Sequence, residues 1–444
     1  MKEKRREGKK MKQVLSCVVL ASLFTGGTAF ASGYRIPEQS IDSTAKAGAN
    51  IASTSSADAA FFNPAAVSFL KDGWLAEIDA TYIHLTAMKY EDSRSPLYNG
   101  KSKVEDYLVP TLFLVSPEWQ NMRFGFSITT PYGLGKRWEQ RFPSTFASKF
   151  ELRMTEFNPT LTYAVTDKLS VAGGVRVVYG TASVMSNGTV IPADSNPYGP
   201  FGVAASRAIS GDAVGFGYNV AIDYKASDEW NFAATYRSKV DLNFEGDASM
   251  TSTAYSPSTG SVLNVPGFNA AVDTQGRVTV IAPAVLALST AYTLDKVTFE
   301  LTFDRTFWSD YRQLNFDYDR SLANYPVLAA AYGPVEKEWK DTTAIRLGLE
   351  YAATQSLTLM AGIAHDDSPA PARTLGFELP DSEAWLFSLG VRYAITDRLN
   401  VGIGALADIK DNRKVYQGRE GQTINGEFTD GAAVLVSCGI EYRF

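Results

Sequence analysis

The sequence contains very few of the residues that build disulfides or metal sites. Its 444 residues include only two cysteines and two histidines. Cys17 lies in an apolar N-terminal run with the features of a removable leader, which leaves Cys438 without a partner for an intrachain disulfide. His84 and His365 stand apart, and no metal-ligand spacing recurs around them. We therefore expect no disulfide, no metal and no other cofactor.

Residues that could support catalysis are equally scarce. His84 is followed by Leu85 and Thr86, and His365 by two aspartates, with no clear nucleophile beside either histidine. A general base has to lie within hydrogen-bonding reach of its target, and nothing in the sequence indicates such a pair. No glycine-rich phosphate loop opens a helix. We expect no catalytic residue and no enzymatic activity.

Basic residues are outnumbered, with 42 lysines and arginines against 48 aspartates and glutamates. Residues 1–31 are typical of a secretory signal peptide, with a basic start, an apolar core from Val14 to Phe24 and a small-x-small cleavage site ending at Ala31. Removal of this segment takes away seven basic and two acidic residues, which changes the net charge from −6 to −11. Because phosphate binding relies on lysine and arginine, we expect no nucleic-acid partner.

Long apolar runs are missing after the signal peptide. None reaches about 18 residues, which argues against a membrane-spanning helix. Apolar residues instead alternate with polar ones, as in 74–82, 157–165, 169–179, 214–224 and 385–395. A period of two predicts strands with one apolar face, and each run has about the 9–11 residues with which a tilted strand crosses a bilayer.

The connections between these runs are of two kinds. Five short turns each follow a tyrosine, namely Tyr163, Tyr224, Tyr292, Tyr351 and Tyr393. Long polar connections lie near 186–212, 247–276, 310–338, 366–384 and 410–426. Short turns on one side and long loops on the other are typical of outer-membrane barrels and argue against a soluble sandwich. The tyrosines would form an aromatic girdle at one membrane interface.

These patterns predict a complete barrel over residues 74–444. The expected strands are 74–87, 104–116, 122–132, 154–166, 169–185, 213–225, 230–246, 277–293, 297–309, 340–353, 356–365, 384–396, 399–410 and 428–444. An even number places both barrel ends on the short-turn, periplasmic side. The last strand alternates up to Phe444, as barrel-assembly signals do, so we expect the barrel-assembly machinery as a partner. The predicted fold is an all-β, 14-stranded antiparallel transmembrane β-barrel in the lipid of the bacterial cell outer membrane.

Residues 32–73 do not share the strand pattern. The stretch from Ser56 to Leu70 is rich in small residues, is partly helical in pattern and is interrupted by Pro64. A barrel of this strand count is too wide for its own side chains to fill, and alanines are small enough to pack closely inside it. We predict that residues 32–73 form a small N-terminal hatch, or plug, inside the lumen. The alternative is an ordinary N-terminal extension with a proline turn.

Short motifs along the whole mature chain add a family resemblance. They are Asn63-Pro64-Ala65, Pro131-Tyr132-Gly133-Leu134, the stretches 215–219 and 234–238, Trp339-Lys340-Asp341, the stretch 366–373, Leu379-Pro380-Asp381, and Trp385. In this order they resemble the FadL family of outer-membrane transporters for long-chain fatty acids and other hydrophobic molecules. The resemblance implies a barrel that is closed by an N-terminal hatch. It also implies a kinked third strand that opens a lateral gap in the wall.

The first group of candidate residues would hold or gate the hatch. It comprises Phe61, Phe62, Asn63, Pro64, Ala65 and Asp366. Pro64 lacks a backbone donor and restricts the residue before it to extended or turn geometry, which suits a bend. The resemblance implies that Asp366 is a lumenal carboxylate that helps to position the hatch. A solvated carboxylate in the turn before Pro369 is the alternative.

The second group interrupts the third strand and comprises Pro131, Tyr132, Gly133 and Gly135. Proline removes a donor from the strand ladder, and glycine tolerates unusual dihedral angles, so we expect pairing to fail or bulge here. The resemblance implies that this is the lateral exit. The alternative is a simple loop entrance at the end of the strand.

The third group concerns the ligand. Each buried methylene contributes about 0.8 kcal/mol, so apolar contact would supply most of the affinity and a basic residue would orient an acid head group. The fatty-acid members of the family would supply a basic residue in the fifth strand, but the stretch 179–183 has none. Lys337 and Lys340 could serve instead, unless they are solvated loop lysines. We expect passive uptake of long-chain fatty acids, with uptake of neutral aromatic hydrocarbons, or a general porin, as the alternatives.

Overall fold

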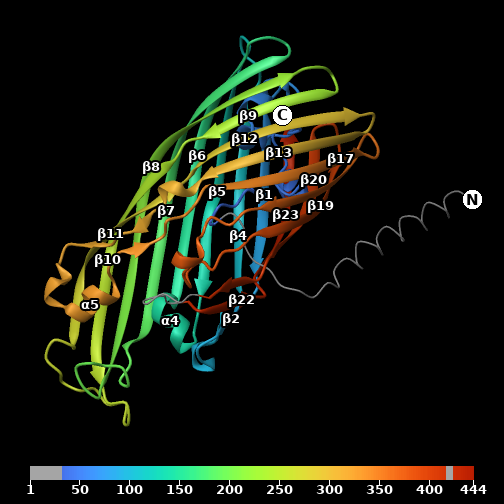
Figure 1. The fold of residues 1–444 in the computed structure, drawn as a ribbon. Coiled ribbons are helices and arrows are strands. Elements are labelled where there is room, and N and C mark those ends of the chain that lie inside the picture. The colour runs from blue at the N-terminus through green and yellow to red at the C-terminus, as the bar shows by residue number, and fades with distance from the viewer. Residues whose placement is uncertain (1–32, 417–423) are drawn as a thin grey trace, which may run out of the picture.

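The strands close into a barrel, as predicted (Figure 1). The computed structural model describes residues 33–416 and 424–444, so the predicted signal peptide lies outside the described residues. Fourteen antiparallel strands form the wall in chain order, and two of them are each interrupted once. β1 pairs along its whole length with β23, from Leu75 opposite Arg443 to Leu85 opposite Ala433, and this pairing closes the barrel.

The strands of the wall have the following bounds. They are β1 (Leu75–Leu85), β4 (Glu105–Val115), β5 (Met122–Arg137), β6 (Lys149–Ala164), β7 (Leu169–Ile191), β8 (Gly202–Lys225), β9 (Trp230–Arg237) continued by β10 (Val240–Tyr255), β11 (Ala270–Ala282) continued by β12 (Ala284–Leu294), β13 (Val297–Phe307), β17 (Thr342–Ala352), β18 (Leu357–Asp366), β19 (Ala384–Ala394), β20 (Leu399–Lys410) and β23 (Ala432–Arg443). Pro283, which cannot donate to a ladder, separates β11 from β12.

The two faces of each strand have opposite polarity. On β1, Glu77 and Asp79 point into the barrel and are buried, whereas Ile78 and Tyr82 point outward and are exposed. Phe216 of β8 is 69% exposed on the same outer face. An apolar outer face and a polar interior suit a wall that is surrounded by lipid. The five tyrosines before the short turns are all exposed on that outer face.

The two ends of the barrel differ as predicted. Turns of two to six residues join strands at the end that holds the C-terminus, for example at 165–168 and 295–296. Long connections at the other end carry α4 (Arg141–Ala147), α5 (Pro326–Ala331), β2 (Lys89–Asp92) and β22 (Gly426–Thr429) (Figure 1). We call these the short-turn end and the long-loop end. None of the helices in the described residues is long and apolar enough to cross a membrane.

Several strands run further than predicted. Most of 186–212 and 247–276 was predicted as loop, yet β7, β8, β10 and β11 extend through these stretches. β6 also begins at 149 instead of 154, and β5 continues to 137 instead of ending at 132. The reason is that strand pairing continues through these stretches, where the buried inner face carries small and polar residues such as Ala205 and Ser252, so the alternation of apolar and polar residues is weak.

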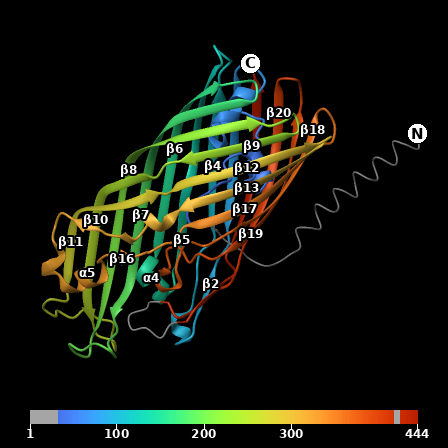
Figure 2. The same ribbon diagram turned by 45° about the horizontal axis from the view of Figure 1, so that its top comes forward.

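Residues 33–73, called here the N-terminal segment, lie within the ring of strands near the short-turn end (Figures 1 and 2). They contain α2 (Ile41–Ala45), α3 (Ala59–Phe62) and the 3-10 helix η2 (Pro64–Phe69). α2 begins with a capping box in which Ser40 and Ser43 satisfy each other's backbone N–H groups. Nearly all of residues 33–67 is buried.

Glycines on the inner wall let this segment approach the strands closely. A Cβ atom at Gly362 of β18 would lie 2.2 Å from the carbonyl carbon of Lys46. A Cβ atom at Gly390 of β19 would lie 2.3 Å from the Cβ of Ala45. Any larger residue at either glycine would push the N-terminal segment away from the wall.

Candidate functional site

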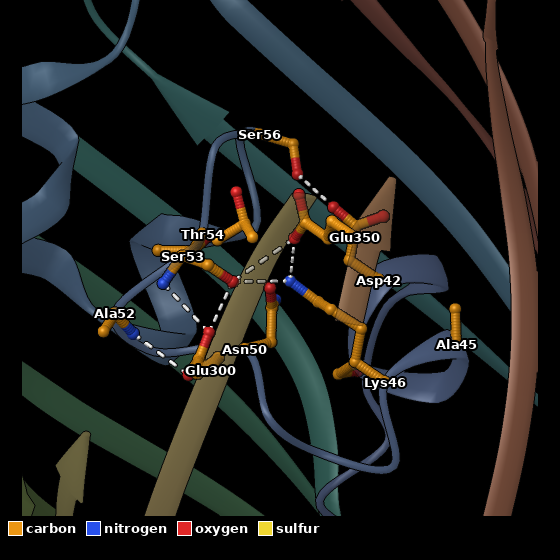
Figure 3. A network of polar contacts seen from close by, with 12 residues as sticks. Asp42, Ala45, Lys46, Asn50, Ala52, Ser53, Thr54, Ser56, Glu300 and Glu350 are labelled. Atoms are coloured by element: carbon orange, nitrogen blue, oxygen red, sulfur yellow. Dashed lines mark hydrogen bonds and ion pairs between the residues drawn. The ribbon is translucent and has the colours of Figure 1, made fainter. Parts of the chain in front are cut away.

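Carboxylates of the wall hold one loop of the N-terminal segment (Figure 3). Glu300 of β13 accepts hydrogen bonds from the backbone N–H groups of Ile51, Ala52 and Ser53 at 2.7, 3.1 and 2.9 Å. Lys46 forms an ion pair with Glu350 of β17 and donates to the Ser53 hydroxyl at 3.0 Å. The loop is therefore fixed by charge-assisted hydrogen bonds in a buried setting.

Burial and charge act in opposite directions on Lys46. Burial alone would lower the pKa of its ammonium group, but the nearby carboxylates of Glu350 and Glu300 outweigh burial and raise the pKa above its ordinary value. Lys46 therefore stays charged, and the ion pair between the segment and the wall persists at neutral pH.

A second anchor surrounds Arg392 of β19. Its guanidinium forms ion pairs with Asp42 of α2 and with Glu77 of β1. Close by, the carboxylate of Asp58 accepts hydrogen bonds from Ser40 at 2.6 Å and from Asn50 at 2.7 Å. These contacts join the first and second halves of the N-terminal segment to each other and to the wall.

The predicted gating residues Phe61 to Ala65 contact strands β6 to β9. Asn63 donates through Nδ2 to Asp223 of β8 at 2.5 Å and to the Ile51 carbonyl at 2.9 Å. The Pro64 carbonyl accepts a hydrogen bond from Thr162 at 2.6 Å, and the Ala65 carbonyl accepts one from Ser170.

The two phenylalanines of this group pack beside a buried arginine. Arg237 of β9 donates to the Phe61 carbonyl at 3.2 Å, and its guanidinium lies 4.3 Å from the centre of the Phe61 ring. Phe61 and Phe62 contact each other edge to face, with 5.0 Å between their ring centres. The ring and the carbonyl of Phe61 thus share one cationic partner on the wall.

Asp366, the sixth predicted gating residue, is a lumenal carboxylate. It is buried and forms an ion pair with Arg346 of β17 at 3.0 Å. Arg346 also pairs with Asp304 at 3.0 Å and donates to the Ala47 carbonyl at 3.0 Å. Asp366 therefore acts on the N-terminal segment through an arginine and is not a solvated turn residue.

The wall is incompletely paired beside β5. β4 and β5 pair only from Leu112 opposite Ile128 to Val115 opposite Gly125, although β4 continues to residue 105. On its other side, β5 pairs with β6 with a register shift between Thr129 and the next paired residue at 132. The interruption around Pro131 therefore bulges the strand, as the residue types suggested.

The N-terminal segment occupies the edge of β5 that β4 leaves unpaired. The backbone N–H of Ile36 donates to the Pro131 carbonyl at 2.8 Å, and the Gly133 N–H donates to the Tyr34 carbonyl at 2.9 Å. Gln39 adds a pair of hydrogen bonds to the backbone of Thr130, at 3.0 and 2.7 Å. A short stretch of the segment thus covers a free strand edge, which would otherwise expose unsatisfied donors and acceptors.

A cavity of about 340 Å³ lies at this interruption, and residues from both faces of the wall line it. Ile83, Val109 and Leu134 line it from the lumenal face, and Leu108 and Arg153 line it from the outer face. Its other lining residues are Ile36, Leu85, Tyr107, Thr130, Gly133, Gly135, Glu151, Leu152, Thr181, Ala182 and Ser183. We call it the wall cavity.

The glycines of the predicted exit leave room for this cavity. A Cβ atom at Gly135 would lie 1.7 Å from the Tyr107 hydroxyl oxygen, and one at Gly133 would lie 3.2 Å from the Cδ1 atom of Ile36. A second, small cavity of about 50 Å³ is lined by Phe61, Phe62, Pro131 and Tyr132 together. The structure therefore brings two residues of the first group together with two of the second, and the other members of both groups lie outside this small cavity.

The two predicted ligand lysines lie elsewhere. Lys337 is buried in the long-loop end and forms an ion pair with Glu378. Lys340 is exposed, and its backbone N–H donates to the Pro369 carbonyl at 3.0 Å. Neither residue lines the wall cavity. Lys337 is therefore not a solvated loop lysine, whereas the exposure of Lys340 is consistent with that alternative.

Sequence reasoning missed the residues that cover β5. Tyr34, Ile36 and Gln39 precede any recognisable strand or helix pattern, so nothing marked them. Arg176, whose guanidinium pairs with Glu156 at 2.8 Å inside the barrel, carried a usable signal. It is a charged residue in a membrane-crossing strand, a position that normally has a function or a buried partner.

The sequence and the fold match one family of membrane proteins. The family model described as "Outer membrane protein transport protein (OMPP1/FadL/TodX)" matches residues 22–444. A long-chain fatty acid transport protein of Escherichia coli is 25% identical over 365 residues, which cover 78% of this chain and 79% of the relative. The 47 kDa outer membrane protein of Pasteurella multocida is 26% identical over 448 residues, which cover 98% of this chain and 99% of the relative.

Solved structures show the same fold at lower sequence identity. A FadL homologue of Pseudomonas aeruginosa superposes with a TM-score of 0.77 at 19% identity, covering 93% of this chain and all of that chain. The toluene transporter TodX of P. putida gives a TM-score of 0.70 at 21% identity, covering 94% and 99%. Because the family model spans nearly the whole chain and the barrel has the same architecture, the protein belongs to the OMPP1/FadL/TodX family of outer-membrane transport proteins.

Proposed function

We propose that the protein takes up long-chain fatty acids, or hydrophobic molecules of similar shape, by passive movement through the wall cavity. As a member of its family it is an outer-membrane transport channel for hydrophobic compounds and not an enzyme. The observation that carries the finer proposal is the edge of β5 that β4 leaves unpaired and that Tyr34, Ile36 and Gln39 of the N-terminal segment cover. When this stretch moves, the wall cavity connects the lumen with the lipid.

The chemistry of the cavity supports a hydrophobic ligand. Ile36, Ile83, Leu85, Val109 and Leu134 supply most of its lumenal surface. A volume of about 340 Å³ lies within the usual range of small-molecule pockets. Each methylene placed there contributes about 0.8 kcal/mol, so a long chain gains enough to enter without a specific polar contact.

The lipid side is the favourable exit for such a ligand. Below the wall cavity the barrel holds the N-terminal segment with buried charges such as Lys46, Asp42 and Arg346, each of which forms an ion pair. Displacing their ion pairs to admit a hydrocarbon would leave buried charges unpaired, which costs several kcal/mol each. Lateral passage between β4 and β5 avoids this cost because it ends in an apolar solvent.

The N-terminal segment would act as the hatch. Phe61, Phe62, Asn63, Pro64 and Ala65 would hold its second half on β6 to β9, and Asp366 would hold its first half through Arg346. A ligand shifts this arrangement only if it binds the open and closed states with different affinity. A hydrocarbon chain in the wall cavity would compete with the Ile36 side chain for space, so it would bind the open state, in which Ile36 has moved away, more tightly than the closed state.

Relatives support two ligand classes. The E. coli relative is named a long-chain fatty acid transport protein, which favours an acid, and the P. putida structure is a toluene transporter, which favours a neutral aromatic molecule. The absence of a basic residue in 179–183 and the engagement of Lys337 by Glu378 favour the neutral ligand as the second candidate.

The lateral route can be tested by filling the gap. Gly133→Leu places a side chain against Ile36 at the gap, and we expect it to reduce uptake of a radiolabelled long-chain fatty acid and of toluene by about tenfold in cells that lack other channels for them. Gly173→Leu is the matched control, because this outward-facing wall glycine has no atom closer than 3.8 Å to an added Cβ. Heat-dependent mobility on gels checks barrel assembly. Normal uptake by a correctly assembled Gly133→Leu protein would exclude the lateral route.

A further inference from the structure

β4 and β5 separate beside the wall cavity and meet again towards the long-loop end. Their ladder ends at Leu112 opposite Ile128, and the next backbone hydrogen bond between the two chains runs from the Lys103 N–H to the Arg137 carbonyl, at 2.8 Å. Between these two attachments, a stretch that the structure describes in full, no residue of β4 pairs with β5. The lateral gap is therefore closed by an attachment at each end.

An ion pair strengthens the attachment towards the long-loop end. The Arg137 guanidinium donates two hydrogen bonds to the Glu105 carboxylate, at 2.7 and 2.8 Å, and Glu105 is only 4% exposed. A contact of this two-point kind fixes the orientation of the partners as well as their distance. The gap therefore cannot widen without breaking one of its two attachments.

The side chain of Tyr107 lies inside this gap. Tyr107 lies on β4, lines the wall cavity and packs, partly buried, against the apolar cluster that contains Ile83 and Leu85. A Cβ atom at Gly135 would lie 1.7 Å from the Tyr107 hydroxyl oxygen and 2.6 Å from its Cζ atom, so the tip of the ring rests on the backbone of β5. The same hydroxyl oxygen lies 3.5 Å from Oε2 of Glu105. The ring thus spans the gap from one strand to the other.

On the β5 side, glycine borders the gap. Gly133 and Gly135 occupy one face of β5, and Leu134 between them occupies the other. Glycine has no side chain that could turn aside, and a tyrosine ring is rigid beyond its two side-chain torsions. Since the strands are fixed at both ends, the free width of the gap depends on the Tyr107 ring.

This arrangement selects ligands by their width. An unbranched chain and a single aromatic ring are both thin when they pass edge-on, whereas a fused-ring system is a broad and rigid plate. We propose that Tyr107 is a specificity-determining residue of the lateral gap, which admits unbranched chains and single rings and excludes fused-ring molecules. This inference rests on the proposed function and deepens it, because it names the residue that decides which hydrophobic molecules pass.

The test compares a narrow ligand with a broad one. Uptake of radiolabelled oleate, and of pyrene by its fluorescence, is measured in cells that lack other channels for hydrophobic molecules. We expect the wild type to take up oleate and to exclude pyrene. Tyr107→Ala should raise pyrene uptake about tenfold and change oleate uptake by less than about twofold, because steric discrimination in an apolar site commonly reaches this size. Tyr107→Phe keeps the ring and should behave as the wild type.

Two further variants test whether the gap itself is the route of the gained uptake. Tyr179→Ala is the matched control, because it removes an exposed, outward-facing ring of β7 that does not line the wall cavity, and it should change neither uptake. Adding Gly133→Leu to Tyr107→Ala should abolish the gained pyrene uptake, because the leucine fills the same gap. If the alanine variant does not assemble, Tyr107→Val provides the same comparison.

Several outcomes would overturn the inference. Pyrene uptake by the wild type, or continued exclusion of pyrene by an assembled Tyr107→Ala protein, shows that Tyr107 does not select by width. Equal changes in oleate and pyrene uptake indicate a structural role only, and pyrene uptake that survives Gly133→Leu lies outside the gap. In each of these cases, normal oleate uptake by the wild type leaves the proposed function standing. A wild type that takes up neither oleate nor toluene rejects the proposed function itself.

Discussion

At the scale of single residues, Arg346 shows how the wall and the N-terminal segment are joined. Its fully buried guanidinium contacts Asp304, Asp366 and the Ala47 carbonyl. Removing one partner of such a buried group costs about 3–5 kcal/mol, because the remaining charge stays in a dry site. Arg346 is therefore one strong anchor of the N-terminal segment, beside those that Glu300 and Arg392 provide.

Glu38 is a residue of the N-terminal segment whose charge changes near neutral pH. It lies in the N-terminal segment and is 5% exposed, and burial raises the pKa of its carboxyl group to about 7. Arg346 and Arg35 oppose this rise, and Asp366 adds to it. A raised pKa means that the docked state holds the proton more tightly than the undocked state, so docking is most stable below about pH 4.5 and weakens as the pH rises through 7.

This sign leads to a pH prediction. We expect docking of the N-terminal segment to lose about 3 kcal/mol of stability between pH 4.5 and pH 8. Hydrogen-exchange mass spectrometry should show this as a lower protection factor for residues 34–40 at pH 8, after correction for the intrinsic exchange rate at each pH. Glu38→Gln should keep a high protection factor at both pH values, since an amide does not ionise. Identical pH dependence in this variant and in the wild type would assign the effect to another group.

Outward-facing residues were predictable one by one, and the lumenal contacts were not. The alternation places Ile78, Phe216 and similar residues toward lipid because one physical rule, apolar against lipid, acts at every second position. The pairing of Arg346 with Asp366 depends on which strands lie next to each other around the lumen. That information is absent from any local pattern.

At the scale of elements, β5 and the N-terminal segment form one unit. The segment supplies the hydrogen bonds that β4 does not make, and the guanidinium of Arg123 on β5 binds four carbonyls of the segment, those of Val67, Leu70, Lys71 and Gly73. The strand beside the gap is thus attached to both ends of the proposed hatch. Movement of the segment and opening of the gap are expected to be one event.

A crosslink can separate this coupled movement from a fixed arrangement. In Ala60→Cys/Gly125→Cys, with Cys438→Ser, the two Cβ atoms would lie 3.3 Å apart, close to the usual separation in a disulfide. We expect oxidation to reduce fatty-acid uptake at least about fivefold and reduction to restore it, because α3 is tethered to β5. Ala248→Cys/Gly276→Cys, with 3.4 Å between the Cβ atoms, joins two wall strands and should have no effect. Full uptake by the oxidised first variant would mean that this part of the segment does not move.

The elements were predicted with uneven success, for a physical reason. Proline and glycine at 131–135 signalled the bulge, because they act on the backbone of their own strand. The strand-like pairing of Tyr34 and Ile36 with β5 was invisible, because an isolated pair of hydrogen bonds needs no alternation. The loops predicted at 186–212 and 247–276 are too long for a related reason, since the inner face of these strands carries small and polar residues and the apolar period is weak.

At the scale of the whole molecule, polarity changes along the barrel axis. The short-turn half is filled by the N-terminal segment and its ion pairs, whereas the long-loop half contains an apolar cluster that includes Trp138, Trp308, Phe377 and Phe428. A hydrophobic ligand that enters from the long-loop end therefore contacts apolar side chains first. Further along the axis the lumen is charged and already filled by the N-terminal segment. At the level of the wall cavity, lateral passage through the wall is therefore more favourable than passage along the axis.

The same arrangement predicts that water-soluble molecules do not pass. In a liposome swelling assay with small sugars, we expect a rate indistinguishable from that of protein-free liposomes, because the N-terminal segment fills the lumen. Liposomes with an open general porin provide the positive control. Sugar flux at the porin rate would reject the plugged channel and restore the general-porin alternative.

The closure of the barrel between β1 and β23 has a consequence for the order of assembly. The N-terminal segment is bonded to both strands of this seam, since Asp79 of β1 accepts from the Ile41 N–H at 3.2 Å and Glu441 of β23 accepts from the Ala57 N–H at 2.8 Å. It is also bonded to the facing wall through Asn63. A segment tied to the wall on both sides cannot be threaded in afterwards without breaking these bonds. We therefore expect the N-terminal segment to take its place before β23 pairs with β1, so that the segment is already inside when the barrel closes.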